Sequence, residues 1–397
     1  MYTSDRLNNM AESATIKMAQ LARELKQQGH QVISLSLGEP DFDTPEHIKQ
    51  AANQALADGY TKYTPVPGLL ELREAIVAKL QRDNNLEYAP NQIVVSNGAK
   101  QSIANLSLSL LNEGDEVVIF APYWVSYNEI IKLSGAKPVF VNASIENDFK
   151  VTAKQFEAAI TDKTRMVLFS SPCNPTGTVY TKEDFAPLVE VLERHSELLV
   201  VSDEIYEYIN FLEGGHVSIA NFESIQERCI IVNGFSKGFS MTGWRLGYIA
   251  GPQWVAAACS KMQGQFTSGA NAFGQKAAVD ALMQDMTPTY EMAKAFRQRR
   301  DLVLALLQEI DGFQVNHPEG AFYVFPNISA LYGKRVDGKV ISNSSEFCEY
   351  LLHEAHVAIV AGSAFGADAC VRLAYSTSEE ELREAIKRIK KAVERLV

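Results

Sequence analysis

A lysine and an arginine stand eight residues apart in a stretch that is rich in small residues. The stretch, residues 233–248, reads NGFSKGFSMTGWRLGY, and its two basic residues are Lys237 and Arg245. The β-branched run 229–232 just before it predicts a buried strand, so Lys237 follows a strand end, where α/β proteins bind small molecules. We interpret Lys237 as an amine that forms a Schiff base with an aldehyde cofactor, whose phosphate Arg245 binds. Considered alone, the stretch also fits a solvated lysine in a glycine-rich loop.

An acidic residue holds the same position after another predicted strand. Asp203 closes the apolar run 198–202, and Tyr206 follows three residues later. A carboxylate beside the ring nitrogen of pyridoxal phosphate keeps that nitrogen protonated, so the ring can accept electrons. The phenol of Tyr206 is suited to hydrogen-bond the 3-oxygen of the same ring. A cap or a turn is the simpler explanation of an isolated Asp-Glu-x-Tyr sequence.

A phosphate site is predicted where a strand meets a helix. The tripeptide Gly98-Ala99-Lys100 lies between the predicted strand 93–96 and an apolar helix, so backbone N–H groups at a helix start would face an anion. Ser236 and Arg245 would add charge-assisted donors. The G-x-G-x-x-G and G-x-x-x-x-G-K-[ST] patterns are both missing from the sequence, which argues against dinucleotides and nucleoside triphosphates.

Three further residues follow predicted strands or lie within one. Asn174, between two prolines, is placed to donate to the ring's 3-oxygen, and Trp124 in Pro-Tyr-Trp is placed to lie on a ring face. Arg372 lies in an apolar run, where a guanidinium is costly unless it is paired. A substrate carboxylate would satisfy it, and so would an internal ion pair. A proline turn and a core indole are the plain alternatives for the first two.

The elements that must position these residues alternate between strands and helices, which is typical of an α/β domain with a mostly parallel sheet. Near-continuous β-branched runs indicate strands buried on both faces. After residue 285 the pattern changes to a long helix at 290–310, short strands and a final helix, which predicts a smaller α+β domain. We expect an N-terminal arm and part of the small domain at 1–45, a large cofactor-binding domain at 46–284 and a small domain at 285–397. Strands are predicted at 33–37, 93–96, 117–120, 139–141, 166–169, 198–202, 229–232, 246–250, 322–325 and 358–360.

Composition narrows the class of protein further. The chain has 397 residues and a formal net charge of −11 without a long basic block, so nucleic acid is not an expected partner. No apolar run approaches the roughly 20 residues that a membrane span needs. Five cysteines without a C-x-x-C pair indicate reduced thiols in the cytoplasm. His353 and His356 lack a third ligand nearby, so no metal site is expected.

Eight stretches, taken together and in order, resemble the class I (fold-type I) pyridoxal phosphate-dependent aminotransferases, in particular the prokaryotic aspartate branch. The resemblance covers nearly the whole chain. It implies the aspartate aminotransferase-like fold, with a large domain whose mostly parallel sheet is flanked by helices, and a smaller α+β domain. The stretches are GEPDF at 38–42, KYTP at 62–65, PYW at 122–124, NPTG at 174–177, SDEIY at 202–206, SK at 236–237, TGWRLG at 242–247 and RLAY at 372–375.

The resemblance also implies roles for individual residues. Lys237 resembles the Schiff-base lysine that moves a proton between Cα and C4′. Asp203 matches the partner of the ring nitrogen, and Tyr206 and Asn174 match the residues on the 3-oxygen. Trp124 resembles the residue that stacks on the ring.

Phosphate and substrate contacts are implied in the same way. The phosphate cradle corresponds to Gly98, Ala99, Lys100, Ser236 and Arg245. Tyr63 is similar to a tyrosine that reaches the phosphate of the neighbouring subunit, which implies a homodimer. The positions that hold the substrate carboxylate correspond to Gly38, Trp124, Asn174 and Arg372.

The implied reaction is a ping-pong transfer of an amino group from an L-amino acid, with aspartate the leading donor, to 2-oxoglutarate. Residues 265–271 and the helix 101–111 carry no cation that would read the second carboxylate of aspartate. A broad-specificity, aromatic or prephenate aminotransferase therefore stays open, and a carbon–sulfur lyase is a further alternative. Gly234 stands where many relatives have a phosphate-binding hydroxyl. A non-enzymatic regulator would need a DNA-binding module, but the first helix is expected almost at the start of the chain.

Overall fold

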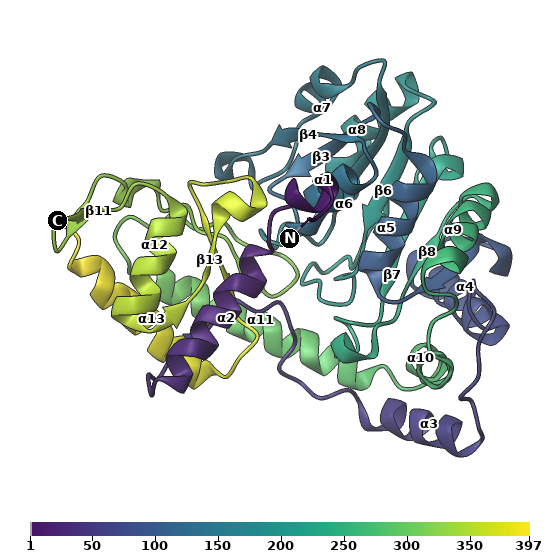
Figure 1. Ribbon diagram of the computed structural model, residues 1–397, viewed down its shortest axis with the longest axis horizontal. Coiled ribbons are helices and arrows are strands. Elements are labelled where there is room, and N and C mark those ends of the chain that lie inside the picture. Colours follow the sequence, from purple (N-terminus) through teal and green to yellow (C-terminus); the bar gives the residue numbers. More distant parts are fainter. Residues whose placement is uncertain (1) are drawn as a thin grey trace.

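Residues 2–397 are described by a computed structural model, in which a large central sheet lies among helices (Figure 1). The sheet has seven strands in the order β2-β8-β7-β6-β5-β3-β4. Neighbouring strands are parallel except at β8, which runs antiparallel to both β2 and β7. The predicted α/β fold with a mostly parallel sheet is therefore confirmed. The strands are β2 (Ile93–Ser96), β3 (Glu116–Ala121), β4 (Lys137–Asn142), β5 (Thr164–Ser170), β6 (Leu199–Asp203), β7 (Cys229–Gly234) and β8 (Gly247–Ala250).

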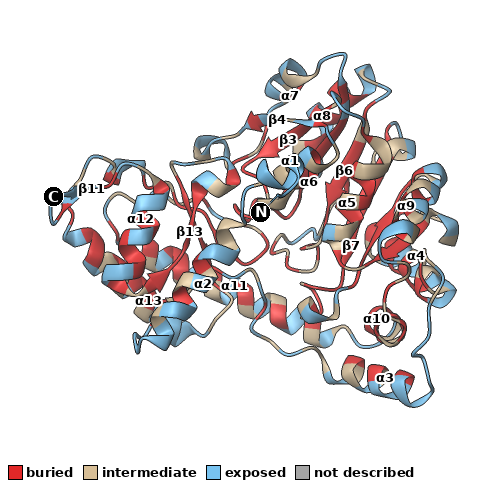
Figure 2. Cartoon of the chain, in the orientation of Figure 1, coloured by how far each residue is buried: buried red, intermediate tan, exposed pale blue. Residues whose placement is uncertain are grey.

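Helices cover both faces of this sheet, and its strands are almost wholly buried except for the edge strand β4 (Figure 2). Val94, Ile119 and Ile230 belong to the hydrophobic core on one face, and their neighbours Val95 and Val118 belong to the core on the other. This alternation explains why the strands read as continuous apolar runs. The helices are α3 (Glu46–Ala57), α4 (Leu70–Asn84), α5 (Ala99–Leu110), α6 (Ser126–Leu133), α7 (Ala153–Ala159), α8 (Lys182–Arg194), α9 (Gln253–Phe266) and α10 (Ala272–Met283).

The C-terminal third forms a second hydrophobic core, and the N-terminal segment packs onto it (Figure 1). Helix α2 (Ala14–Gln27) contributes Met18 and Ala22 to this core, and β1 (Ile33–Ser34) pairs with β12 (Val357–Ala358). The N-terminal segment thus packs with the C-terminal third, while the division into domains, with boundaries at residues 46 and 285, stays a prediction. The other elements are α1 (Asp5–Asn8), α11 (Thr287–Leu307), β9 (Tyr323–Val324), β10 (Arg335–Val336), β11 (Lys339–Val340), α12 (Ser344–Tyr350), a π-helical turn (Leu351–Ala355), β13 (Val360–Ala361), β14 (Val371–Ala374) and α13 (Glu379–Glu394).

Two predicted strands of the smaller unit differ from the observed ones. The strand predicted at 33–37 is reduced to β1, because the next carbonyl oxygen, that of Leu35, accepts from Ala374 N–H instead of continuing the pairing with β12. The run 358–360 is split into β12 and β13, because β12 pairs with β1 whereas β13 pairs with β14. The long helix predicted at 290–310 is observed as α11, three residues earlier at each end. None of the helices among residues 2–397 is both long enough and apolar enough to cross a bilayer.

Candidate active site

A cavity of about 270 Å³ lies where the loops after β2, β3, β5, β6 and β7 meet the start of β8. Parallel strands direct their carboxyl ends to the same edge, and the antiparallel β8 brings its first residue to that edge. Eleven of the predicted site residues line the cavity, whereas Gly98 and Tyr63 do not. The eleven are Gly38, Ala99, Lys100, Trp124, Asn174, Asp203, Tyr206, Ser236, Lys237, Arg245 and Arg372.

Lys237 presents its amine to this cavity from the loop after β7. Its Nζ donates a hydrogen bond of 2.5 Å to the carbonyl oxygen of Gly38, which arrives from the N-terminal segment. Burial lowers the pKa of Lys237 to about 8; Arg372 and Arg245 act in the same direction, and Glu39 opposes them. A lowered pKa makes the amine a more available base near neutral pH.

Asp203 is the last residue of β6, and its side chain is held by two donors. Oδ2 accepts a 2.6 Å hydrogen bond from the hydroxyl of Tyr127, and Oδ1 accepts one of 3.2 Å from the backbone N–H of Ile205. Burial raises the pKa of Asp203 to about 6, although the hydrogen bond from Tyr127 pulls it down. The carboxylate is therefore ionised at neutral pH and is fixed in direction.

Tyr206 forms a hydrogen bond with a second tyrosine that lines the cavity. Its hydroxyl lies 2.8 Å from that of Tyr323 on β9, and burial raises the pKa of both phenols. Gly38 passes so close to the Tyr323 hydroxyl that a Cβ at this position would collide with it. Position 38 therefore requires glycine if the backbone is to approach Lys237 this closely.

Arg372 on β14 is a buried guanidinium whose partners are neutral. Nη1 donates to Oδ1 of Asn174 at 3.0 Å, and Nη2 donates to the carbonyl oxygen of Ser36 at 2.6 Å. Its Nε lacks a hydrogen-bond partner, and its Cζ lies 4.6 Å from the ring centroid of Tyr323. Burial lowers the pKa of Arg372, since nothing negative within residues 2–397 pairs with it. The internal ion pair considered from sequence is thus not formed. A bound carboxylate would supply the negative partner that this buried guanidinium lacks.

Two glycines at the predicted phosphate cradle allow the start of α5 to pack closely against Arg245 and β8. Gly98 precedes α5 with φ +83°, and a Cβ there would collide with the guanidinium of Arg245. A Cβ on Gly247 would collide with the backbone N of Ala99, so this glycine seats the first turn of α5 on β8. The N–H groups at the start of α5, Ser236 and the guanidinium of Arg245 thereby border one cavity. Such a set of donors suits a phosphate.

Gly234 has a packing reason to be glycine. It is paired with Gly247 across β7 and β8, and a Cβ on Gly234 would lie 2.8 Å from the Cα of Gly247. A serine or threonine side chain would begin with this Cβ, so it would not fit here unless the neighbouring backbone shifted. The cradle therefore relies on Ser236, Arg245 and the backbone of α5.

The side chain of Lys100 lies beside an aromatic ring, a position that a phosphate ligand does not require. Its Nζ lies 5.0 Å from the centroid of the Trp124 ring, and burial, followed by the nearby Arg245, lowers its pKa. Trp124 packs edge-to-face against Tyr127, with ring centroids 5.5 Å apart. Lys100 thus offers a partly desolvated ammonium beside the predicted stacking residue.

Tyr63 lies outside the cavity, with a side chain that is 97% exposed. It borders a separate surface groove formed by residues 60–64 and 269–273. Its predicted reach into a neighbouring subunit is not tested by a single chain and stays a prediction.

Ten residues that line the cavity were not predicted from the sequence, among them Tyr127 and Tyr323, which contact Asp203 and Tyr206. Tyr127 lies in α6, three residues after Trp124, and this nearness in sequence was the only signal that could have pointed to it. Tyr323 was assigned only to a predicted strand, and its contact with Tyr206 joins residues 117 positions apart. No local pattern reports such a contact.

Comparison with known proteins agrees with this geometry. The family model described as "Aminotransferase class I and II" matches residues 30–389. The "Bifunctional aspartate aminotransferase and glutamate/aspartate-prephenate aminotransferase" of Petunia hybrida is 48% identical over 396 residues, or 98% of this chain and 82% of that protein. The crystal structure of the aspartate aminotransferase from Rhizobium meliloti matches with a TM-score of 0.97 at 43% identity, covering 100% of both chains. The aspartate aminotransferase from Thermus thermophilus with maleate matches with a TM-score of 0.92 at 40% identity, covering 99% of this chain and 100% of that one. The chain therefore belongs to the family of class I and II aminotransferases.

Proposed function

We propose that this protein transfers the amino group of L-aspartate to 2-oxoglutarate, with pyridoxal phosphate as its cofactor. The observation that carries the proposal is that Lys237 and Arg372, a base and an unpaired buried guanidinium, border the same cavity as the carboxylate of Asp203. The family match and the names of the Petunia, Rhizobium and Thermus relatives support the same activity.

The residues of the cavity fit pyridoxal phosphate. The start of α5 and Arg245 form a cradle that a Cβ on Gly98 would fill, which leaves room and donors for a phosphate. Asp203 supplies the carboxylate for a protonated ring nitrogen, and Lys237 supplies the amine for an aldehyde. Tyr206 and Asn174 supply the polar groups for the 3-oxygen, and Trp124 supplies a ring face.

The chain's own residues divide the chemistry among them. Bound pyridoxal phosphate supplies an electron sink for the amino acid. Asp203 holds a proton at the ring nitrogen, because its ionised carboxylate favours the charged form of that group. Lys237 Nζ accepts the proton from the substrate Cα, and its lowered pKa favours this role. Arg372 and Asn174 hold the α-carboxylate and so align the Cα bond that breaks.

Lys100 is the basic residue of the cavity that remains without a role in these steps. Four basic residues line the cavity, and the other three are committed to the aldehyde (Lys237), the phosphate (Arg245) and the α-carboxylate (Arg372). The backbone N–H of Lys100 can serve the phosphate at the start of α5 while its ammonium faces the substrate beside Trp124. We assign that ammonium to the second carboxylate of aspartate or 2-oxoglutarate. The Thermus relative, solved with the dicarboxylate maleate, supports a dicarboxylic ligand.

A panel of amino donors with 2-oxoglutarate tests the proposal. Aspartate is expected to give the highest kcat/KM with 2-oxoglutarate. Glutamate, whose exchange with 2-oxoglutarate gives no net product, is monitored through the absorbance change of the bound cofactor, which should follow each donor even without an acceptor. Release of pyruvate and ammonia without a keto acid would instead identify a carbon–sulfur lyase. Equal rates with all donors would refute the role of Lys100.

Prephenate is the second candidate acceptor. The name of the Petunia relative includes prephenate beside aspartate. Prephenate carries a carboxylate on its ring in addition to that of its keto acid, so the same two cations would read it. Amino transfer from aspartate to prephenate is therefore the companion assay.

We further propose a homodimer in the cytoplasm. Tyr63, Leu56, Tyr60 and Phe266 are large side chains exposed on the single chain, and a protein partner would cover them. All five cysteines are free and buried, which suits a reducing compartment. Light scattering should give twice the chain mass, and a Tyr63→Phe variant should bind the cofactor more weakly while remaining dimeric.

A further inference from the structure

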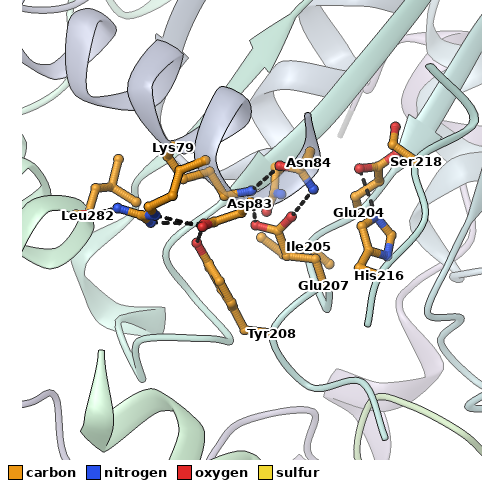
Figure 3. A network of polar contacts seen from close by, with 12 residues as sticks. Lys79, Asp83, Asn84, Glu204, Ile205, Glu207, Tyr208, His216, Ser218 and Leu282 are labelled. Carbon is orange, nitrogen blue, oxygen red and sulfur yellow. Dashed lines mark hydrogen bonds and ion pairs between the residues drawn. The ribbon is translucent and has the colours of Figure 1, made fainter. Parts of the chain in front are cut away.

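The turn that carries Asp203 and Tyr206 also carries two carboxylates on its reverse side. Asp203 and Tyr206 line the active-site cavity, whereas Glu207 lines a different cavity of about 470 Å³ together with His216. Figure 3 shows Glu204 beside His216 and Ser218, and Glu207 beside Asn84. Each side chain with a predicted role is thus followed directly in sequence by an anchored carboxylate.

Glu204 is fixed by two donors from the segment that follows the turn. Its Oε1 accepts a 2.7 Å hydrogen bond from the hydroxyl of Ser218, and its Oε2 lies 2.9 Å from Nε2 of His216. The Glu204 side chain is 1% exposed. A carboxylate buried to this degree is held in place by these partners, because leaving it unpaired would be costly.

Glu207 is fixed by helix α4, which is distant in sequence. Lys79 forms an ion pair with its Oε1, and Asn84 Nδ2 donates to its Oε2 at 3.1 Å. Lys79, whose side chain is 1% exposed, also donates to Oδ1 of Asn84 at 2.7 Å. The three side chains close a triangle of contacts between α4 and the turn (Figure 3).

The backbone transmits this anchoring to the site. The N–H of Glu204 donates to the carbonyl oxygen of Val232 on β7 at 2.8 Å, and the N–H of Glu207 donates to that of Glu204 at 2.9 Å. Ile205 N–H binds the carboxylate of Asp203 itself. Shifting Glu204 or Glu207 would therefore displace the groups that aim Asp203 and Tyr206.

We propose that the two buried pairs, Lys79–Glu207 and His216–Glu204, are positioning devices that hold the Asp203–Tyr206 turn in its reactive geometry. A buried ion pair adds little net stability compared with apolar residues of the same shape. The contribution of each pair here is to fix the position of the turn. This inference rests on the roles proposed above for Asp203 and Tyr206.

The test uses Lys79→Met, Glu207→Gln and the double variant K79M/E207Q in the full-length holoenzyme. Lys79→Met leaves a buried carboxylate unpaired and lowers the melting temperature, whereas the double variant regains much of that loss because no charge stays unpaired. Positioning is not regained in the double variant. Its kcat should stay roughly 10- to 100-fold low, the cost of a displacement of about 1 Å, while KM for aspartate changes less than about threefold.

Hydrogen exchange supplies a readout that does not depend on activity. The amides of Glu204, Glu207 and Ile209 should exchange roughly tenfold faster in the double variant, with and without cofactor. Leu188→Ala, at a buried position on α8, serves as the matched control because it removes core packing and none of the hydrogen bonds or ion pairs of the turn. The control should lower the melting temperature and leave kcat and these amides unchanged.

Two results would overturn the inference: unchanged exchange of these amides, or wild-type kcat in K79M/E207Q despite faster exchange. Asp203→Asn, measured in parallel, separates this failure from that of the proposed function. If Asp203→Asn loses turnover while the double variant does not, the site roles stand and the positioning inference falls. If Asp203→Asn keeps turnover, the roles proposed for the site are wrong.

Discussion

Replacing Asp203 with asparagine should stabilise the cofactor-free protein while it removes activity. Burial raises the pKa of this carboxyl from 3.8 to about 6, so the folded state binds a proton more tightly than the unfolded state does. The protonated form therefore adds stability below about pH 3.8, and that contribution is lost as pH rises through about 6. Above pH 6 the buried charge costs about 3 kcal/mol.

The variant avoids this cost and keeps the local hydrogen bonds. Asparagine is close in shape to aspartate, so its Oδ1 can accept from the N–H of Ile205 and its Nδ2 can donate to the hydroxyl of Tyr127. At pH 8 the cofactor-free D203N protein should be more stable by up to about 3 kcal/mol, a rise of several degrees in melting temperature. Below pH 4 the advantage should vanish.

Calorimetry of both proteins, without cofactor and at equal concentration, between pH 4 and 8 measures this difference. The same D203N protein, loaded with cofactor, should turn over at least about 1,000-fold more slowly, because the ring nitrogen loses its charged partner. A variant that is less stable at pH 8, or a difference that does not shrink toward pH 4, would refute the reasoning about the buried charge. Near-normal turnover would refute the catalytic role.

Four further substitutions test separate parts of the site. Lys237→Ala should abolish the visible absorption band of the bound cofactor, and a band that survives would mean that another amine holds the aldehyde. Arg372→Ala should raise KM for aspartate about 10- to 100-fold through the loss of charge-assisted hydrogen bonds, with cofactor affinity unchanged in a fluorescence titration; equal losses for both ligands would contradict this assignment. Lys100→Met should lower kcat/KM for aspartate at least about tenfold more than kcat/KM for phenylalanine, since only aspartate loses an ion partner. An equal loss for both donors would mean that Lys100 binds the cofactor phosphate and not the substrate. Tyr127→Phe removes the hydrogen bond that lowers the pKa of Asp203, so kcat should fall about tenfold and its acidic limb should move to higher pH; an unchanged pH profile would show that Tyr127 only fills space.

Local patterns were sufficient for the sheet and for much of the cavity lining. Lys237, Asp203 and Asn174 were predicted because each follows a β-branched run, and parallel strands bring such ends to one edge. Tyr63 and the subunit contact stay predictions, since a single chain presents only an exposed side chain there.

The contacts between distant segments could not be predicted in the same way. The carbonyl of Gly38 meets Lys237 across 199 positions, and the carbonyl of Ser36 meets Arg372 across 336. These contacts depend on how the smaller unit packs against the sheet, and the hydrophobic pattern of the sequence does not predict that packing. The direction of β8 was also hidden, because a buried strand has the same composition whether it runs parallel or antiparallel.

The reversed direction of β8 has a consequence for how this protein tolerates changes in length. The segment from Gly234 to Gly247 begins and ends on paired strands whose two glycines touch, and Phe235 N–H binds the carbonyl of Leu246 across its base. An extra residue between Lys237 and Met241, where Phe239 and Met241 are buried, would shift Lys237 relative to Arg245. The exposed bend at Gly214 and Gly215, where added atoms meet nothing, should accept the same insertion. Insertion tolerance should therefore fall sharply between two loops that lie only some twenty residues apart.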